Sequence, residues 1–157
     1  MSIAEISSAP VFVTSADQPL AAAAREMCAR GVGALVVIDT RDAQPRPVGI
    51  LTDRDIVCGQ VARHADLYCL TVDDVMTRNP LTLPADAAVS EAIQAISLRG
   101  VRRAPVVDRS GVLVGIVTLD DLLPALAQQL GELAGIADAQ ARALPAVAAG
   151  ADTGRPA

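Results

Sequence analysis

A threonine and an aspartate three residues apart occur twice in this sequence, each time after a glycine and two aliphatic residues. Thr52 and Asp55 form the first pair, and Thr118 and Asp121 form the second, 66 residues later. The aliphatic residues predict a strand, and the threonine predicts the start of a helix. The amides of a helix N-terminus suit a phosphate. A carboxylate one turn further along accepts two hydrogen bonds, which matches the cis hydroxyls of a ribose.

The same spacing has simpler explanations. A threonine followed three residues later by an acidic residue is a common helix cap, and duplication would copy a cap as readily as a binding site. The acidic pairs Asp53/Asp55 and Asp120/Asp121 could also support acid–base chemistry or magnesium binding. Favourable interaction with the helix dipole accounts for these carboxylates more simply. The residues alone leave capping and ligand binding open.

The first copy of the motif is predicted to lie in a β-α-β-β-α unit. Asp17 is expected to cap the first helix and Gly31 to end it. The polar segment 40–47 predicts a turn. The expected strands are 11–14, 34–38 and 48–51, and the second helix covers 53–62.

The second copy predicts the same order. Asp86 is expected to cap its first helix, Gly100 to end that helix, and 109–111 to form a tight turn. The expected strands are 80–83, 104–107 and 112–117, with a helix from Leu119. Short lead-in segments at 3–8 and 72–77 extend the repeat. The domains are therefore predicted as 3–62 and 72–130, with a linker at 63–71 and a partly disordered tail at 131–157.

The composition argues against several functions. The net charge is -5, and the chain has one Phe, one Tyr and no Trp, which disfavours nucleic acid binding. No apolar run approaches the roughly 20 residues of a membrane span, and the N-terminus does not resemble a signal peptide, so we expect a cytoplasmic protein without membrane contact. Cys58, His64 and Cys69 do not match a zinc site, so no metal is expected. All three cysteines, Cys28, Cys58 and Cys69, are expected to be small buried residues.

The duplicated Gly-h-h-Thr-x-x-Asp string resembles the cystathionine-β-synthase (CBS) domain family. The resemblance covers roughly residues 3–130, and the strings at 102–108 and 75–80 add to it. It is similar to a tandem CBS pair, often called a Bateman module, and looks most like the short bacterial pairs without an attached enzyme or transporter. The implied fold is α+β, with two β-α-β-β-α repeats packed sheet to sheet about a pseudo-twofold axis.

The resemblance implies two clefts for adenosyl ligands such as AMP, ADP, ATP, S-adenosylmethionine or NAD. Asp55 and Asp121 would bind ribose hydroxyls, and Thr52 and Thr118 would lie near phosphate. Adenine would contact small or apolar residues, each of which could equally be plain core. These are Val11, Val32, Gly33, Ala34 and Ile50 in one half, and Pro80, Leu81, Val101 and Ile116 in the other.

Arg102 and Arg103 are the asymmetric element, because the first half has Gly33 and Ala34 at the matching positions. Adjacent strand residues point to opposite faces, so one arginine at most is expected to enter a given cleft directly. By resemblance they would reach the Thr52 cleft and hold a phosphate there. The other cleft would take a less charged adenosyl group or stay empty. The arginines could instead be solvated surface residues.

These observations predict a non-catalytic sensor that binds an adenosyl ligand and needs no cofactor. The resemblance to CBS pairs favours a homodimer. So does an apolar helix around Leu122, Leu123, Leu126 and Leu130, although that helix could instead cover the sheet of its own chain. Two alternatives stay open. One is a ligand-free module that dimerises or regulates a protein target that the sequence does not identify, and the other is a nucleotide hydrolase using Asp55 or Asp121.

Overall fold

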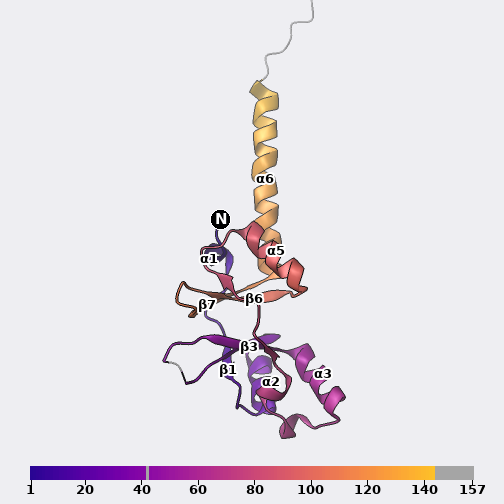
Figure 1. Ribbon diagram of the computed structural model, residues 1–157. Helices are drawn as coiled ribbons and strands as arrows, with labels where there is room; N and C mark the ends of the chain where they lie inside the picture. Colours follow the sequence, from indigo (N-terminus) through magenta and orange to yellow (C-terminus); the bar gives the residue numbers. More distant parts are fainter. Residues whose placement is uncertain (42, 144–157) are drawn as a thin grey trace, which may run out of the picture. The chain divides into compact units, whose positions relative to one another are not determined.

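The first half of the chain forms a four-stranded mixed sheet covered by helices. The computed structural model describes residues 1–41 and 43–143 (Figure 1). Strand β1 pairs parallel with β2, which pairs antiparallel with β3, which pairs antiparallel with β4 (Thr77–Arg78). The continuous aliphatic run of β2 is buried, as expected for a strand covered on both faces. The elements are β1 (Val13–Ser15), α2 (Leu20–Arg30), β2 (Ala34–Ile38), β3 (Pro47–Thr52), α3 (Asp53–Arg63) and η1 (Leu67–Cys69).

The second half repeats this arrangement with a three-stranded sheet. Strand β5 pairs parallel with β6, and β6 pairs antiparallel with β7. Both halves carry a register shift at the same place, near the end of the central strand. The elements are α4 (Val72–Val75), β4 (Thr77–Arg78), β5 (Leu83–Pro84), α5 (Val89–Arg99), β6 (Arg103–Val107), β7 (Leu113–Thr118) and α6 (Leu119–Ala143).

The lead-in segments are exchanged between the halves. Helix α1 (Ile3–Ile6) precedes the first half but packs in the core of the second, where Ile3 is fully buried against residues that include Leu83 and Val89. Ser8 bridges to Ile116 of β7 through two backbone hydrogen bonds of 2.9 and 3.1 Å. Each half is therefore completed by chain that belongs, in sequence, to the other repeat.

Helix α4 makes the reciprocal exchange into the first half. Val72 is fully buried in the first core, and the Val72 amide donates to the Gln18 carbonyl at 2.9 Å. Strand β4 extends the first sheet by pairing with β3, where Gly49 lies opposite Arg78. The spatial cores therefore differ from the sequence repeats at their lead-ins.

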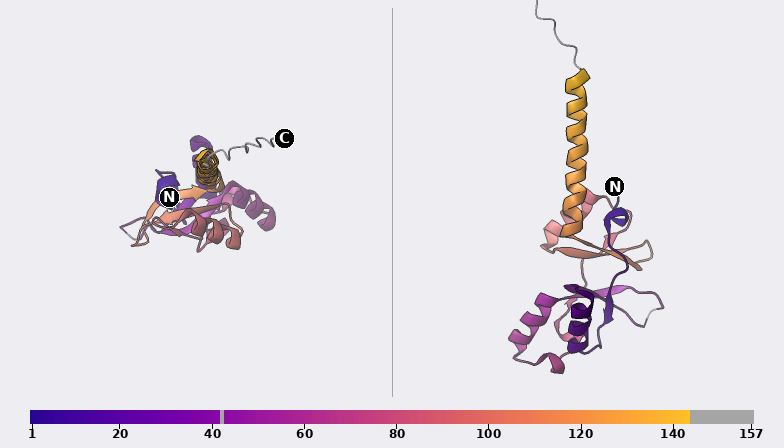
Figure 2. Two further views of the ribbon diagram at one scale, coloured as in Figure 1. Left: turned by 90° about the horizontal axis from the view of Figure 1, so that it is seen from above. Right: turned by 180° about the vertical axis from the view of Figure 1, so that it is seen from behind.

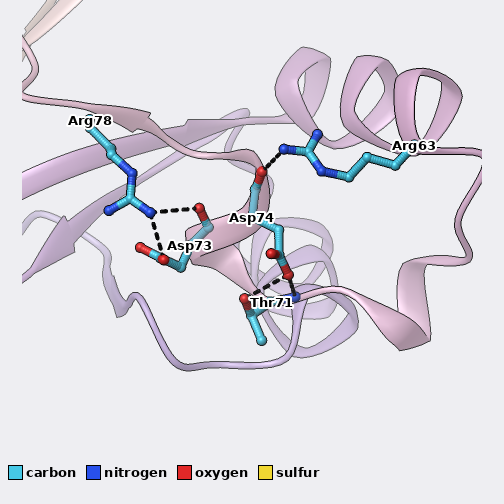
Figure 3. Close-up of polar contacts among 5 residues, drawn as sticks. All are labelled: Arg63, Thr71, Asp73, Asp74 and Arg78. Carbon is cyan, nitrogen blue, oxygen red and sulfur yellow. Dashed lines mark hydrogen bonds and ion pairs between the residues drawn. The ribbon is translucent and has the colours of Figure 1, made fainter.

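Polar contacts hold α4 in place (Figure 3). The Arg63 guanidinium, at the end of α3, donates to the Asp74 carbonyl, and Arg78 forms an ion pair of 2.6 Å with Asp73. The Thr71 amide and hydroxyl both donate to the Asp74 carboxylate at 2.8 Å. These two bonds, the amide first, hold the pKa of Asp74 below its ordinary value.

The helix ends confirm some expected caps and correct others. Gly31 and Gly100 end α2 and α5 in the left-handed conformation, as predicted. The expected caps Asp17 and Asp86 are wrong, because α2 begins after Pro19 and α5 after Ala88. Asp17 instead accepts from the Ser15 hydroxyl at 2.5 Å, and Asp86 pairs with Arg109 at 3.1 Å. Each acidic residue lies too far before its helix to reach the first amides.

Three other expectations change. The outer strands β1 and β5 begin later than predicted, at Val13 and Leu83. The three cysteines are exposed, so the expectation that they are buried is wrong. Residues 131–143 of the expected tail are helical, and residues 144–157 lie outside the described part of the chain.

Helix α6 is one continuous element of 25 residues (Figure 2). The chain divides into two compact units at this helix, after Ala125. Within the first unit, Leu122 is only 3% exposed and joins the second core. The start of α6 therefore covers its own sheet, which was one of the two roles left open for it.

Candidate functional site

The duplicated Thr-x-x-Asp pairs lie at the points where β3 enters α3 and β7 enters α6. The Thr52 amide donates to Asp55 Oδ2 at 2.9 Å, and the Asp55 amide donates to Thr52 Oγ1 at 3.1 Å. Thr118 donates to Asp121 Oδ2 from its amide at 2.8 Å and from its hydroxyl at 2.7 Å. Both pairs therefore stabilise helix starts, which is the capping interpretation. Each aspartate still has a carboxylate oxygen, Oδ1, with no hydrogen bond from the described residues.

The glycines of the motif make room for the exchanged lead-ins. A Cβ on Gly49 would lie 2.6 Å from Met76 Sδ, and one on Gly115 would lie 2.7 Å from Ser7 Oγ. Those distances are far shorter than real contacts, so only glycine lets the lead-in chain approach the strand. The glycine of the repeated string therefore serves the fold. The threonine that follows it ends the strand, and the aspartate lies in the first turn of the next helix.

A cleft of about 410 Å³ opens where the two halves meet inside the first unit. Its apolar wall comes from the segment around Val11, between α1 and β1, and from the loop before β2. Its polar wall comes from the second half. The lining residues are Ser8, Pro10, Val11, Phe12, Val32, Gly33, Ala34, Arg102, Arg103, Ile116, Thr118, Leu119 and Asp120.

The β6–β7 hairpin places the two arginines at this cleft. In its register Arg103 lies opposite Thr118, and the Leu119 amide donates to the Arg102 carbonyl at 2.9 Å. Both arginines line the cleft that contains Thr118, whereas the sequence assigned their phosphate to the Thr52 cleft and led us to expect one arginine at most in each cleft. Arg102 precedes β6, where the alternation of side chains along a strand does not yet apply.

Two guanidinium groups line the cleft. Among the described residues, none donates or accepts a hydrogen bond or forms an ion pair with the guanidinium group of Arg102 or Arg103. A Cβ on Gly33 would lie 3.3 Å from Asp53 Oδ2 and 3.7 Å from Arg103 Nη1, so a carboxylate and a guanidinium both lie close to this glycine. Asp120 is the single carboxylate of the lining, and the amides at the start of α6 add partial positive charge. The arrangement suits an anion beside an apolar group.

The cleft brings together about half of the predicted site residues. Those present are Val11, Val32, Gly33, Ala34, Arg102, Arg103, Ile116 and Thr118, and those outside its lining are Thr52, Asp55, Asp121, Ile50, Pro80, Leu81 and Val101. Ile50 is buried in β3, and Leu81 packs against the second core, as their plain-core interpretation implies. Asp121 does not line the cleft, but it is hydrogen-bonded to Thr118, which does.

Sequence reasoning missed Ser8, Pro10, Phe12, Leu119 and Asp120. The exchange of the first lead-in brings Ser8 to the cleft by pairing it with Ile116, and no local pattern shows that exchange. Phe12 packs against the core of its own half. Leu119 and Asp120 follow directly from the strand end at Thr118. Pairing the strands on either side of the 109–111 turn would have placed them and the arginines together.

Two further searches bear on the site. In residues 1–41 and 43–143, no group of three or more His, Cys, Asp or Glu side chains could hold a metal ion. Within those ranges, too, no helix has the length and apolarity that crossing a membrane requires.

Comparison with known proteins agrees with this architecture. The CBS domain model matches residues 3–59 and 72–128. The chain is 32% identical over 123 residues to the uncharacterised protein MK0525 of Methanopyrus kandleri, a match covering 78% of this chain and 61% of that protein.

Two solved structures share the fold. The CBS domain protein TA0289 of Thermoplasma acidophilum, of unknown function, has a TM-score of 0.72 and 27% identity over 79% of this chain and 68% of that one. The CBS domain pair of MJ0100, solved with 5′-methylthioadenosine and S-adenosyl-L-methionine, has a TM-score of 0.69 and 25% identity over 80% of this chain and 99% of that one. The predicted α+β fold class is confirmed. The chain belongs to the CBS domain family and is a tandem CBS pair.

Proposed function

We propose that the cleft beside Thr118 binds a phosphate-bearing adenosyl ligand and that the protein is a non-catalytic regulatory module. The observation that carries this proposal is the pair of unpartnered guanidinium groups, Arg102 and Arg103, facing an apolar wall in one cleft. The MJ0100 pair, solved with two adenosyl compounds, supports the adenosyl part of the ligand.

The charge of the cleft favours a phosphate over a sulfonium. The aromatic base would lie against Val11, Val32 and Ile116, and the phosphate would face Arg102, Arg103 and the start of α6. S-adenosylmethionine carries a positive sulfonium near the ribose, which two arginines would repel. AMP places a negative group at the matching position. We therefore expect AMP to bind more tightly than S-adenosylmethionine or uncharged 5′-methylthioadenosine.

Asp121 would hold the ribose while it caps α6. Its Oδ2 accepts both bonds from Thr118, and Oδ1 is the oxygen that can turn to a ribose hydroxyl. Asp55 has the same arrangement at the start of α3, but it lies outside the cleft that contains the arginines. Asp121 should therefore matter more than Asp55 for a phosphate-bearing ligand, which reverses the asymmetry expected from the sequence.

The cleft offers little for catalysis. Its polar side chains are Ser8, Thr118, Asp120 and the two arginines, and the Thr118 hydroxyl already donates its proton to Asp121. The same Asp121 oxygen also accepts from the Thr118 amide, so this bond forms part of the helix cap of α6. Incubation with ATP and magnesium should therefore leave the nucleotide intact, and product formation lost in Asp121→Ala would favour the hydrolase alternative.

Titration calorimetry with AMP, adenosine, 5′-methylthioadenosine and S-adenosylmethionine tests the proposal. A hydrogen bond to a charged group contributes about 1.5–3 kcal/mol, so Arg103→Ala should weaken AMP binding by roughly 10- to 150-fold. It should change adenosine binding little. Arg99→Ala is the matched control, since Arg99 is exposed in the last turn of α5 and is absent from the cleft.

Two results would count against the proposal. Equal affinity for AMP and adenosine would remove the phosphate from the argument. Absence of binding by every compound would favour the ligand-free module, a reading supported by the capping bonds that already occupy both Thr-Asp pairs.

A further inference from the structure

Asp53, at the start of α3, has a carboxylate that the helix cap does not use. Thr52 and Asp55 make the cap, whereas Asp53 Oδ1 accepts from the Arg54 amide at 2.8 Å. Among the described residues, none donates a hydrogen bond to Asp53 Oδ2. In the second half Leu119 stands at the matching position, and the Thr-Asp cap forms there without this acid. Capping therefore does not account for Asp53.

Gly33 brings this carboxylate beside the proposed binding cleft. Gly33 lines the cleft, and together with Asp53 it also lines a neighbouring hollow between α2 and α3. The Asp53 amide donates to the Gly33 carbonyl at 3.2 Å, which holds the start of α3 against this glycine. Because a Cβ on Gly33 would lie 3.3 Å from Asp53 Oδ2 and 3.7 Å from Arg103 Nη1, those two atoms are at most about 7 Å apart. The two described side chains form no ion pair with each other.

The charges near the cleft match one phosphate group. Its two guanidinium groups, Arg102 and Arg103, balance the roughly two negative charges of a phosphate monoester. The nearby carboxylates are Asp120 in the lining and Asp53 beyond Gly33, and Arg54 lines neither hollow. A second or third phosphate would therefore add negative charge without meeting a further cation of the lining.

We propose that Asp53 determines specificity by making the cleft favour a monophosphate over a di- or triphosphate. The inference rests on the proposed function, because it requires the ligand phosphate to lie on Arg102 and Arg103. The arginines neutralise the first phosphate, so repulsion from Asp53 acts mainly on phosphates that extend past Arg103. AMP should therefore bind more tightly than ADP, and ADP more tightly than ATP.

Asp53 also has a simpler role. An acidic residue in the first turn of a helix interacts favourably with the helix dipole. That interaction stabilises α3 and would affect the binding of AMP and ATP equally. The ratio of the ATP and AMP dissociation constants, called the AMP preference below, therefore separates the two roles.

Calorimetric titration with AMP, ADP and ATP tests the inference, without magnesium so that the phosphates keep their full charge. Asp53→Asn removes the charge and keeps the size of the side chain. Asp53 is exposed, so water screens it, and a unit charge about 7 Å away should change affinity roughly threefold at low salt. ATP carries two or so more charges than AMP, so the AMP preference should fall roughly three- to tenfold. Asp53→Glu keeps the charge and should keep most of the preference.

Two controls distinguish the position of the charge from its sign. Asp138→Asn removes the same charge from an exposed residue of α6 that lines neither hollow, and it should leave the AMP preference unchanged. At 1 M salt the Debye length is about 3 Å, so the wild-type chain and Asp53→Asn should then show the same preference.

The possible failures are distinguishable. If AMP binds and Arg103→Ala weakens it, an AMP preference that is unchanged in Asp53→Asn would overturn this inference and leave the proposed function standing. An equal fall in Asp138→Asn would assign the preference to net charge and would also overturn it, as would tighter binding of ATP than of AMP by the wild-type chain. Absence of AMP binding by the wild-type chain would overturn both proposals.

Discussion

The exchange of the lead-in helices is tested most directly by Ile3→Ala. Ile3 is fully buried, and the other buried residues of its core cluster, Leu83 to Leu122, all lie in the second half. The substitution removes three carbons, worth about 0.8 kcal/mol each on transfer, and leaves a cavity. We expect it to lower the free energy of unfolding by about 2–5 kcal/mol. That is a large share of the roughly 5–15 kcal/mol typical of a native protein.

Hydrogen exchange shows which half is weakened. Ile3→Ala should speed amide exchange in α5, β6 and β7, whereas Val72→Ala should do so in β1, β2 and β3, because the two lead-ins serve opposite halves. Urea unfolding supplies the free energies. Ile136→Ala is the control, since Ile136 is 57% exposed, and at sub-micromolar protein its effect should stay within about 0.5 kcal/mol.

The opposite pattern would refute the exchange. Faster exchange after Ile3→Ala confined to β1, β2 and β3 would place α1 with its own repeat, and a loss below about 1 kcal/mol would mean that Ile3 is not in a closed core.

The remaining predictions concern local structure. Gly59→Ala should lower the free energy of unfolding by on the order of 1 kcal/mol in urea titration, because overpacking of the new methyl group against Val75 outweighs the better helix propensity of alanine. A stabilised variant would show that Val75 moves to make room. Gly100→Ala should cost about 1–2 kcal/mol from its φ of 64° alone, since a Cβ there meets no atom within 4 Å. The lowered pKa of Asp74 means that its bonds to Thr71 stabilise the fold above the ordinary pKa of 3.8 and are lost as pH falls through the lower folded value. Thr71→Val should move that pKa upward in an NMR titration, and an unchanged pKa would exclude the hydroxyl as a cause.

Local patterns predicted most of the elements. The aliphatic runs gave β2 and β6, and Gly31 and Gly100 gave the ends of their helices, because each signal depends on neighbouring residues and on burial of one face. The incorrectly predicted helix caps show where local sequence patterns fail. Asp17 and Asp86 are good capping residues, yet the chain makes an additional turn before each helix, and their side chains bond elsewhere.

The binding cleft was predicted only in part. Thr118 and the arginines were recognised as chemistry-bearing residues, but their grouping depended on which strands pair and in which register. Ser8 could not be placed, because its position at the cleft requires the first lead-in to cross to the second half. The exposure of all three cysteines likewise depends on which helix faces pack inward, and residue type alone does not decide that.

The sequence by itself determined the repeat, the family and the positions of the two Thr-x-x-Asp turns, since these follow from residue identity and spacing along the chain. The tertiary structure decided that the lead-ins are exchanged and that Arg102 and Arg103 share a cleft with Thr118. Those facts depend on contacts between residues distant in sequence, which hydrophobic burial and strand register select together. Gly49 illustrates both. Its place in the motif is visible in the sequence, whereas the close approach of Met76 that requires a glycine there is visible only in the tertiary structure.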